Sequence, residues 1–130
     1  MTYRASHGHD EKAGTYTSDG NIPKIKGGKF IVGKFEDTLP KFFLKKRPMA
    51  SLINFDADLY SSTKCALDHS YSVIDKKTVL IFDEFINNKN WELDEYKALN
   101  DFCVENSFDY RVLAVSFFTK QVAIKLIKMP

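Results

Sequence analysis

The chain has 130 residues, of which 44% are hydrophobic and 14% aromatic, so it can form a core and is too apolar for a disordered chain. The 19 Lys and Arg residues against 17 Asp and Glu give a net charge of +2, which provides no general attraction to nucleic acid or anionic lipid. The sequence contains no apolar run near the roughly 18 residues of a membrane span, and no apolar signal-peptide core at its start.

Two cysteines, Cys65 and Cys103, are too few for a disulfide framework or a zinc motif. We therefore expect a reduced, cytoplasmic protein with no nucleic-acid or membrane partner. Residues 1–28 are rich in Gly, Ser and Thr and poor in aliphatic residues, which predicts a loop or a poorly ordered N-terminal arm. Residues 29–130 have the composition of one folded unit.

Strand-like and helix-like segments alternate in the first half of this unit. Residues 29–33 (KFIVG) are a short apolar run that ends in glycine, which predicts a strand. Residues 39–47 predict a short helix, and residues 50–55 (ASLINF) predict a second strand that is followed by acidic residues.

The alternation continues in the second half. Residues 61–75 predict a helix with Ser61 or Ser62 as its N-cap, and residues 78–82 (TVLIF) predict a strand buried on both faces. A further helix is predicted over residues 90–106 and a closing hairpin over 110–117 and 121–127. This order predicts an α/β fold with a mostly parallel sheet and a C-terminal antiparallel hairpin, in which ligands bind beyond the carboxyl ends of the parallel strands.

Carboxylates follow two of the predicted strands directly. Asp56 and Asp58 come after the strand at 50–55, and Asp83 and Glu84 come after the strand at 78–82. If the strands are neighbours, about 5 Å apart, all four carboxylates converge and repel one another unless a divalent cation neutralises them. Such hard oxygen ligands suit Mg²⁺, Mn²⁺ or Ca²⁺. Acidic residues also begin solvated loops and cap helices, so the pattern alone leaves both interpretations open.

Three motifs in order resemble the macrocin O-methyltransferase family, whose members are metal-dependent class I S-adenosylmethionine methyltransferases. They are residues 33–40 (GKFEDTLP), residues 54–63 (NFDADLYSST) and residues 81–85 (IFDEF), and residues 95–98 (EYKA) fit the helix before the final hairpin. The resemblance covers about residues 27–128. It implies a partial Rossmann-like methyltransferase sheet.

The resemblance also implies roles for individual residues. Asp56, Asp83 and Glu84 match the metal ligands, although the family more often has aspartate at the position of Glu84. Asp58 matches the proposed general base that takes a proton from a small hydroxylated substrate. Phe35 and Glu36 fall where the family approaches the cofactor's adenine ring.

No strand followed by a glycine-rich turn precedes these motifs, so the chain resembles only the C-terminal half of such a domain. A truncated methyltransferase, a non-catalytic half-domain that keeps the metal site, and a glycosyltransferase with an aspartate-x-aspartate metal motif remain open. We expect the 50–55 strand to have an open apolar edge, which either pairs with the 29–33 strand or joins copies of the chain into a homo-oligomer.

Overall fold

A computed structural model describes residues 20–86 and 89–128. Within these residues, four strands form one sheet in the order β1-β2-β4-β3. Their bounds are Leu52–Phe55 for β1, Val79–Phe82 for β2, Phe108–Val115 for β3 and Val122–Lys128 for β4.

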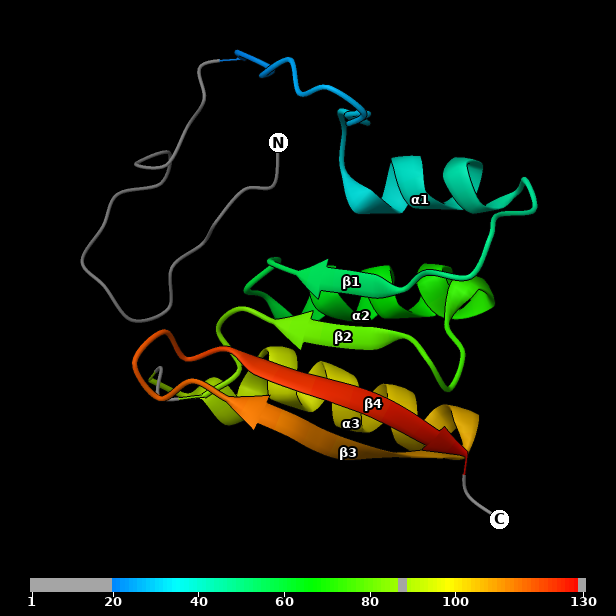
Figure 1. The fold of residues 1–130 in the computed structure, drawn as a ribbon. Coiled ribbons are helices and arrows are strands. Elements are labelled where there is room, and N and C mark those ends of the chain that lie inside the picture. Colours follow the sequence, from blue (N-terminus) through cyan, green and yellow to red (C-terminus); the bar gives the residue numbers. More distant parts are fainter. Residues whose placement is uncertain (1–19, 87–88, 129–130) are drawn as a thin grey trace.

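The described part of the chain contains the α-helices α1 (Phe35–Phe43), α2 (Tyr60–Ser70) and α3 (Glu95–Asn106). The 3₁₀ turn η1 (Tyr71–Val73) follows α2, and η2 (Trp91–Leu93) precedes α3. Helices α2 and α3 lie on the same face of the sheet, whereas α1 lies beyond the β1 edge (Figure 1). Between the sheet and these two helices is the core, whose fully buried apolar side chains include Leu67, Leu80, Phe82, Leu99, Phe102 and Ile124.

The predicted α/β class and the closing hairpin are confirmed, but the predicted mostly parallel sheet is wrong. Only β1 and β2 are parallel, while β4 is antiparallel to both β2 and β3. The hairpin therefore does not merely extend a parallel sheet. Its second strand, β4, lies directly against β2 and makes antiparallel pairs the majority.

The predicted strand at residues 29–33 is also wrong, because these residues are neither helix nor strand. A strand needs a neighbour for its backbone hydrogen bonds, and β1 pairs only with β2 in the described part of the chain. Gly33, with φ 143°, turns the chain into α1, which begins four residues earlier than predicted and contains Pro40. The predicted pairing of this segment with the 50–55 strand is thus not found.

Strand β2 is buried on one face, not on both as its apolar sequence predicted. Leu80 and Phe82 are fully buried, whereas Val79 and Ile81 are half-buried. In a mostly antiparallel sheet one face can remain open to solvent, and α2 and α3 cover only the opposite face in Figure 1.

Helix α2 begins after Leu59, which caps it with no side-chain hydrogen bond, so neither predicted serine cap is used.

Side chains fix the β1–β2 register at the start of both strands. The buried Thr78 hydroxyl donates to the Ala50 carbonyl oxygen at 2.7 Å, and the Asp75 carboxylate accepts from the Thr78 N–H at 3.1 Å. Hydrogen bonds from the Lys77 N–H and from the Thr78 N–H and hydroxyl hold the pKa of Asp75 below its usual value. Further along, the Phe55 and Phe82 rings stack with centroids 4.9 Å apart. The register is therefore set by both polar and aromatic contacts.

The predicted N-terminal arm lies outside the described residues up to residue 19, and residues 20–28 contain neither helix nor strand. No helix among the described residues is long and apolar enough to cross a membrane.

Replacing Gly33 with alanine should destabilise the start of α1. The φ of 143° strains an L residue, and a Cβ at this position would lie 2.7 Å from Thr38 Cγ2. We expect Gly33→Ala to lower the free energy of unfolding by about 1–3 kcal/mol in urea titrations. Adding Thr38→Ser removes the clashing methyl group and should restore only part of the loss. Unchanged stability in Gly33→Ala would contradict the strain.

Candidate functional site

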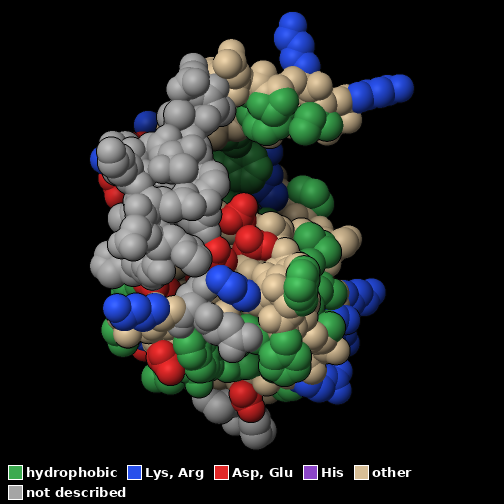
Figure 2. Space-filling view, turned by 90° about the vertical axis from the view of Figure 1, so that its left-hand side faces the viewer, with side chains coloured by type: hydrophobic (Ala, Val, Ile, Leu, Met, Phe, Trp, Pro, Cys, Tyr) green, Lys and Arg blue, Asp and Glu red, His purple; other side chains and the backbone are tan. Residues whose placement is uncertain are grey.

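The two acidic strand ends lie side by side, as predicted. Phe55 pairs with Phe82 in parallel register, and the Asp83 N–H donates to the Phe55 carbonyl oxygen at 3.0 Å. One residue further, Asp56 and Asp83 follow neighbouring strands, which are about 4.8 Å apart in any sheet. Figure 2 faces this end of the sheet and shows acidic side chains gathered below a hollow.

A third carboxylate, Glu95 in the first turn of α3, connects the two strand ends. Its side chain is fully buried, and Glu95 Oε2 accepts from the Glu84 N–H at 3.1 Å. Burial raises the pKa of Glu95 to about 7, and the Asp58 charge adds to the rise, although the backbone N–H groups of Glu84, Ala57 and Asp58 favour the charged form. One side chain therefore contacts the backbone beyond both β1 and β2.

Helix α3 also holds the start of α2, immediately after the first acidic pair. The Tyr60 hydroxyl donates to Asp101 Oδ2 at 2.9 Å, and Lys97 Nζ, which donates to the same oxygen, lies 4.5 Å from the centre of the Tyr60 ring. The Asp101 hydrogen bond raises the pKa of Tyr60. The loop between β1 and α2 is therefore attached to α3 near both of its ends.

The acidic residues themselves differ in surroundings. Asp83 is half-buried and its Oδ1 accepts a hydrogen bond from Gln121 Nε2, which comes from the hairpin before β4. Asp58 has a left-handed backbone with φ 59°, and its Oδ1 is shielded from solvent. Asp56 is exposed. Asp56 is thus the exposed carboxylate, whereas Asp58 and Asp83 are more constrained.

Phe35 and Asp56 line one cavity of about 180 Å³ between α1 and β1. Ligand cavities usually measure about 300–1,000 Å³, so this space alone is too small to enclose a nucleoside cofactor. Glu36 points elsewhere, since its side chain is 70% exposed and lies 3.5 Å from Lys34 Nζ. The structure therefore brings only one of the two predicted cofactor residues to the predicted metal residues.

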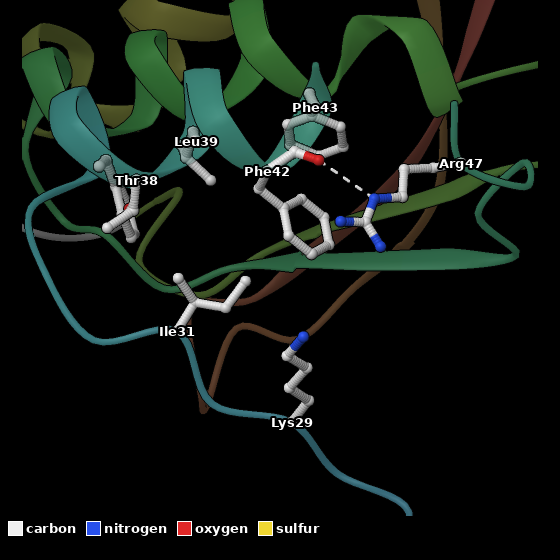
Figure 3. Close-up of a pocket in the computed structure, with 8 residues that line it drawn as sticks. Lys29, Ile31, Thr38, Leu39, Phe42, Phe43 and Arg47 are labelled. Carbon is white, nitrogen blue, oxygen red and sulfur yellow. Dashed lines mark hydrogen bonds between the residues drawn. The ribbon is translucent and has the colours of Figure 1, made fainter. Parts of the chain in front are cut away.

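A larger cavity of about 430 Å³ lies between α1 and the segment before it, and shares Phe35, Leu39 and Phe43 with the smaller one (Figure 3). At its rim, the Arg47 guanidinium lies 3.8 Å from the Phe42 ring centre, and Arg47 Nε donates to the Phe42 carbonyl oxygen at 3.1 Å. The apolar side of α1 thus forms a wall of both cavities.

The carboxylates at the two strand ends meet only some of the requirements of a hard cation such as Mg²⁺. Mg²⁺ is commonly held by one or two carboxylates with water or substrate oxygens as the other ligands, and neighbouring Asp56 and Asp83 offer such a pair. Within residues 20–86 and 89–128, however, no three His, Cys, Asp or Glu side chains are grouped to hold a metal ion. Glu84 is therefore not gathered with the two aspartates into a three-carboxylate site.

The sequence profile of the macrocin-O-methyltransferase (TylF) family matches residues 26–114, which is more than half of the chain. The chain belongs to the macrocin O-methyltransferase family. The resemblance seen in the three sequence motifs is therefore confirmed.

A solved structure shares the fold of this family member. It is the apo structure of CalS11, a TDP-rhamnose 3'-O-methyltransferase of calicheamicin biosynthesis, with a TM-score of 0.58 and 23% identity. The match covers 73% of this chain but 40% of that enzyme, so the chain spans less than half the length of the methyltransferase it matches. No curated protein sequence matches the chain.

Two residues of the site, Glu95 and Gln121, had no predicted site role. Glu95 occupies the first turn of a helix, where acidic residues are common because they interact with the helix dipole. Gln121 precedes β4 in an ordinary hairpin loop. Their contacts with the strand ends depend on how α3 and the hairpin pack, which no local pattern reveals.

Glu95 should make stability depend on pH. Its pKa is about 7 in the folded chain against an ordinary 4.5, so folding favours the protonated form. The resulting stability is fully present below about pH 4.5 and is lost as the pH rises to about 7, with a total on the order of 3 kcal/mol.

We expect Glu95→Gln to remove this dependence of the free energy of unfolding on pH. Urea titrations from pH 4.5 to 8 with EDTA present measure it. Glu105→Gln, at the other end of α3, is the matched control and should keep the slope. Equal slopes in the wild type and Glu95→Gln would show that Glu95 does not have the raised pKa.

Proposed function

We propose that this chain forms the acceptor side of an S-adenosylmethionine-dependent O-methyltransferase site at the carboxyl ends of β1 and β2. The supporting observation is the parallel register that continues from Phe55 and Phe82 into Asp56 and Asp83, in a chain of a methyltransferase family. The acceptor is a small hydroxylated molecule. A sugar fits this role because the similar enzyme is described as acting on TDP-rhamnose.

Asp58 is the proposed general base. Methyl transfer forms an oxygen–carbon bond as the sulfur–carbon bond of the sulfonium breaks, and the acceptor hydroxyl must lose its proton. Asp58 takes that proton through Oδ2, since its Oδ1 is shielded. The left-handed backbone at Asp58 and the contacts of the neighbouring residues with α3 fix the position of this carboxylate, and such positioning supplies much of the rate in a two-substrate reaction.

Asp56 and Asp83 are the proposed ligands of a divalent cation, with Glu84 as a further ligand through movement of its side chain. When bound, the cation would supply charge that lowers the pKa of the acceptor hydroxyl. Gln121 keeps Asp83 oriented toward the end of the sheet by its hydrogen bond. Phe35, in the cavity that contains Asp56, is proposed to contact the cofactor, with Glu36 nearby in sequence.

A second candidate function is a non-catalytic half-domain that binds the cation and not the cofactor. It is favoured by the cavity of about 180 Å³ beside Asp56, which is too small to enclose the cofactor. The two candidates differ in one property, which is the response to S-adenosylmethionine once the cation is present.

Thermal unfolding with ligands separates the two candidates. We expect Mg²⁺ to raise the Tm of the wild type, and S-adenosylmethionine to raise it further, because ligands that bind only the folded chain stabilise it. Asp56→Asn and Asp83→Asn should lose the Mg²⁺ response, while Glu105→Gln, which removes a charge at the far end of α3, should keep it.

A response to Mg²⁺ without one to S-adenosylmethionine would favour the half-domain over the methyltransferase site. No response to either ligand would contradict both.

A further inference from the structure

Tyr60 belongs to the acidic motif at residues 54–63, but the proposed reaction does not use its hydroxyl. It is the first residue of α2 and comes two positions after Asp58. Its hydroxyl is part-buried and donates to Asp101 Oδ2 on α3 at 2.9 Å. A side chain that joins two helices at this point restricts the backbone just before α2, where Asp58 lies.

Asp58 is the central residue of a tight turn between β1 and α2. The Leu59 N–H donates to the Ala57 carbonyl oxygen at 2.6 Å, which closes a γ-turn around Asp58. The φ of Asp58 is 59°, and a γ-turn with a positive φ at its centre is rare and strained. Glycine adopts a positive φ readily, whereas aspartate keeps such a conformation only where surrounding contacts impose it.

Helix α3 holds the chain on both sides of this turn. On one side, the Glu95 carboxylate lies against the backbone N–H groups of Ala57 and Asp58. On the other side, the Tyr60 hydroxyl binds Asp101, further along α3. Because both anchors are on one helix, the ends of the turn are held at a fixed separation. The short segment between them therefore has little freedom to relax.

Lys97 strengthens the hydrogen bond between Tyr60 and Asp101. Its Nζ donates to the same Asp101 oxygen and lies 4.5 Å from the centre of the Tyr60 ring. The hydrogen bonds from Lys97 and Tyr60 lower the pKa of Asp101, so this carboxylate is a charged acceptor at neutral pH. Hydrogen bonds to charged groups are about twice as strong as those between neutral groups. The three side chains thus form one connected anchor.

We infer that Tyr60 and Asp101 are positioning residues, whose hydrogen bond maintains the strained turn that carries the Asp58 carboxylate. The inference rests on the proposed role of Asp58 as the general base. A base must lie within hydrogen-bond reach of the proton that it takes, so a carboxylate held in place before the acceptor binds increases the rate. Glycine at this position would relieve the strain but would also remove the carboxylate.

A comparison of glycine with alanine at position 58 measures the strain without any ligand. Asp58→Gly and Asp58→Ala both remove the carboxylate, but only alanine keeps a Cβ at the positive φ. In thermal unfolding of the full chain, we expect the Tm of the glycine variant to be higher by about 4 °C. Tyr60→Phe removes the hydroxyl and keeps the ring. In that background the difference should fall below half or reverse, because the turn can relax.

Nuclear magnetic resonance adds a readout that a general loss of stability would not change. The scalar coupling between HN and Hα of Asp58 and its α-carbon and β-carbon chemical shifts report the backbone conformation of this residue. They should change in Tyr60→Phe and, to a smaller extent, in Asp101→Asn, which removes the charge of the acceptor. Tyr110→Phe is the matched control, because it removes another tyrosine hydroxyl that contacts α3, at Asn100, and should leave the Asp58 signals unchanged.

Equal Tm values for Asp58→Gly and Asp58→Ala would show that the turn is not strained and would overturn the inference. An unchanged Tm difference together with unchanged Asp58 signals in Tyr60→Phe would also overturn it, since other contacts would then hold the turn. These measurements need neither cation nor cofactor nor acceptor. A missing response to Mg²⁺ and S-adenosylmethionine contradicts the proposed function instead, so the two failures are distinguishable.

Discussion

The Glu95 carboxylate, buried in the first turn of α3, is the contact on which the arrangement of the site depends. It accepts a hydrogen bond from the backbone beyond β2 and lies against the backbone beyond β1. Backbone donors offset only part of the cost of burying this carboxyl group, since burial still raises its pKa to about 7. Helix α3 thereby keeps two acidic strand ends at a fixed separation, although their charges would otherwise drive them apart.

Contacts between β1 and β2 support this arrangement of the two strand ends. Thr78 and Ala50 align the starts of β2 and β1, and the stacked Phe55 and Phe82 rings align their ends. A slip of either strand by one residue would turn the ring of that strand from the core to the opposite face and move Asp56 out of line with Asp83. The register that forms the core is thus the same register that forms the candidate site, and neither can change without the other.

Sequence patterns predicted the features of the fold that depend on residues close together in the chain. The apolar run TVLIF, the carboxylates after two strands and the closing hairpin each follow from alternation and turn residues, and their adjacency follows from sheet geometry. The KFIVG run has strand-like residues and yet forms no strand, because a strand needs a partner for its backbone hydrogen bonds and these residues pair with none of the strands in the described part of the chain. Glu95 fell inside the predicted 90–106 helix without a site role, because burial is decided by packing, and packing is not visible in a local sequence window.

Binding of Mn²⁺ followed by nuclear magnetic resonance tests the central claim, which is that the two strand ends meet at one cation site. A paramagnetic ion broadens the signals of nearby amides, so a single site should broaden the amides of Asp58 and Glu84 together, at the same low Mn²⁺ concentration. The Val79 amide, at the start of β2, should remain sharp as an internal control. Broadening at only one of the two strand ends, or none at either, would contradict the account.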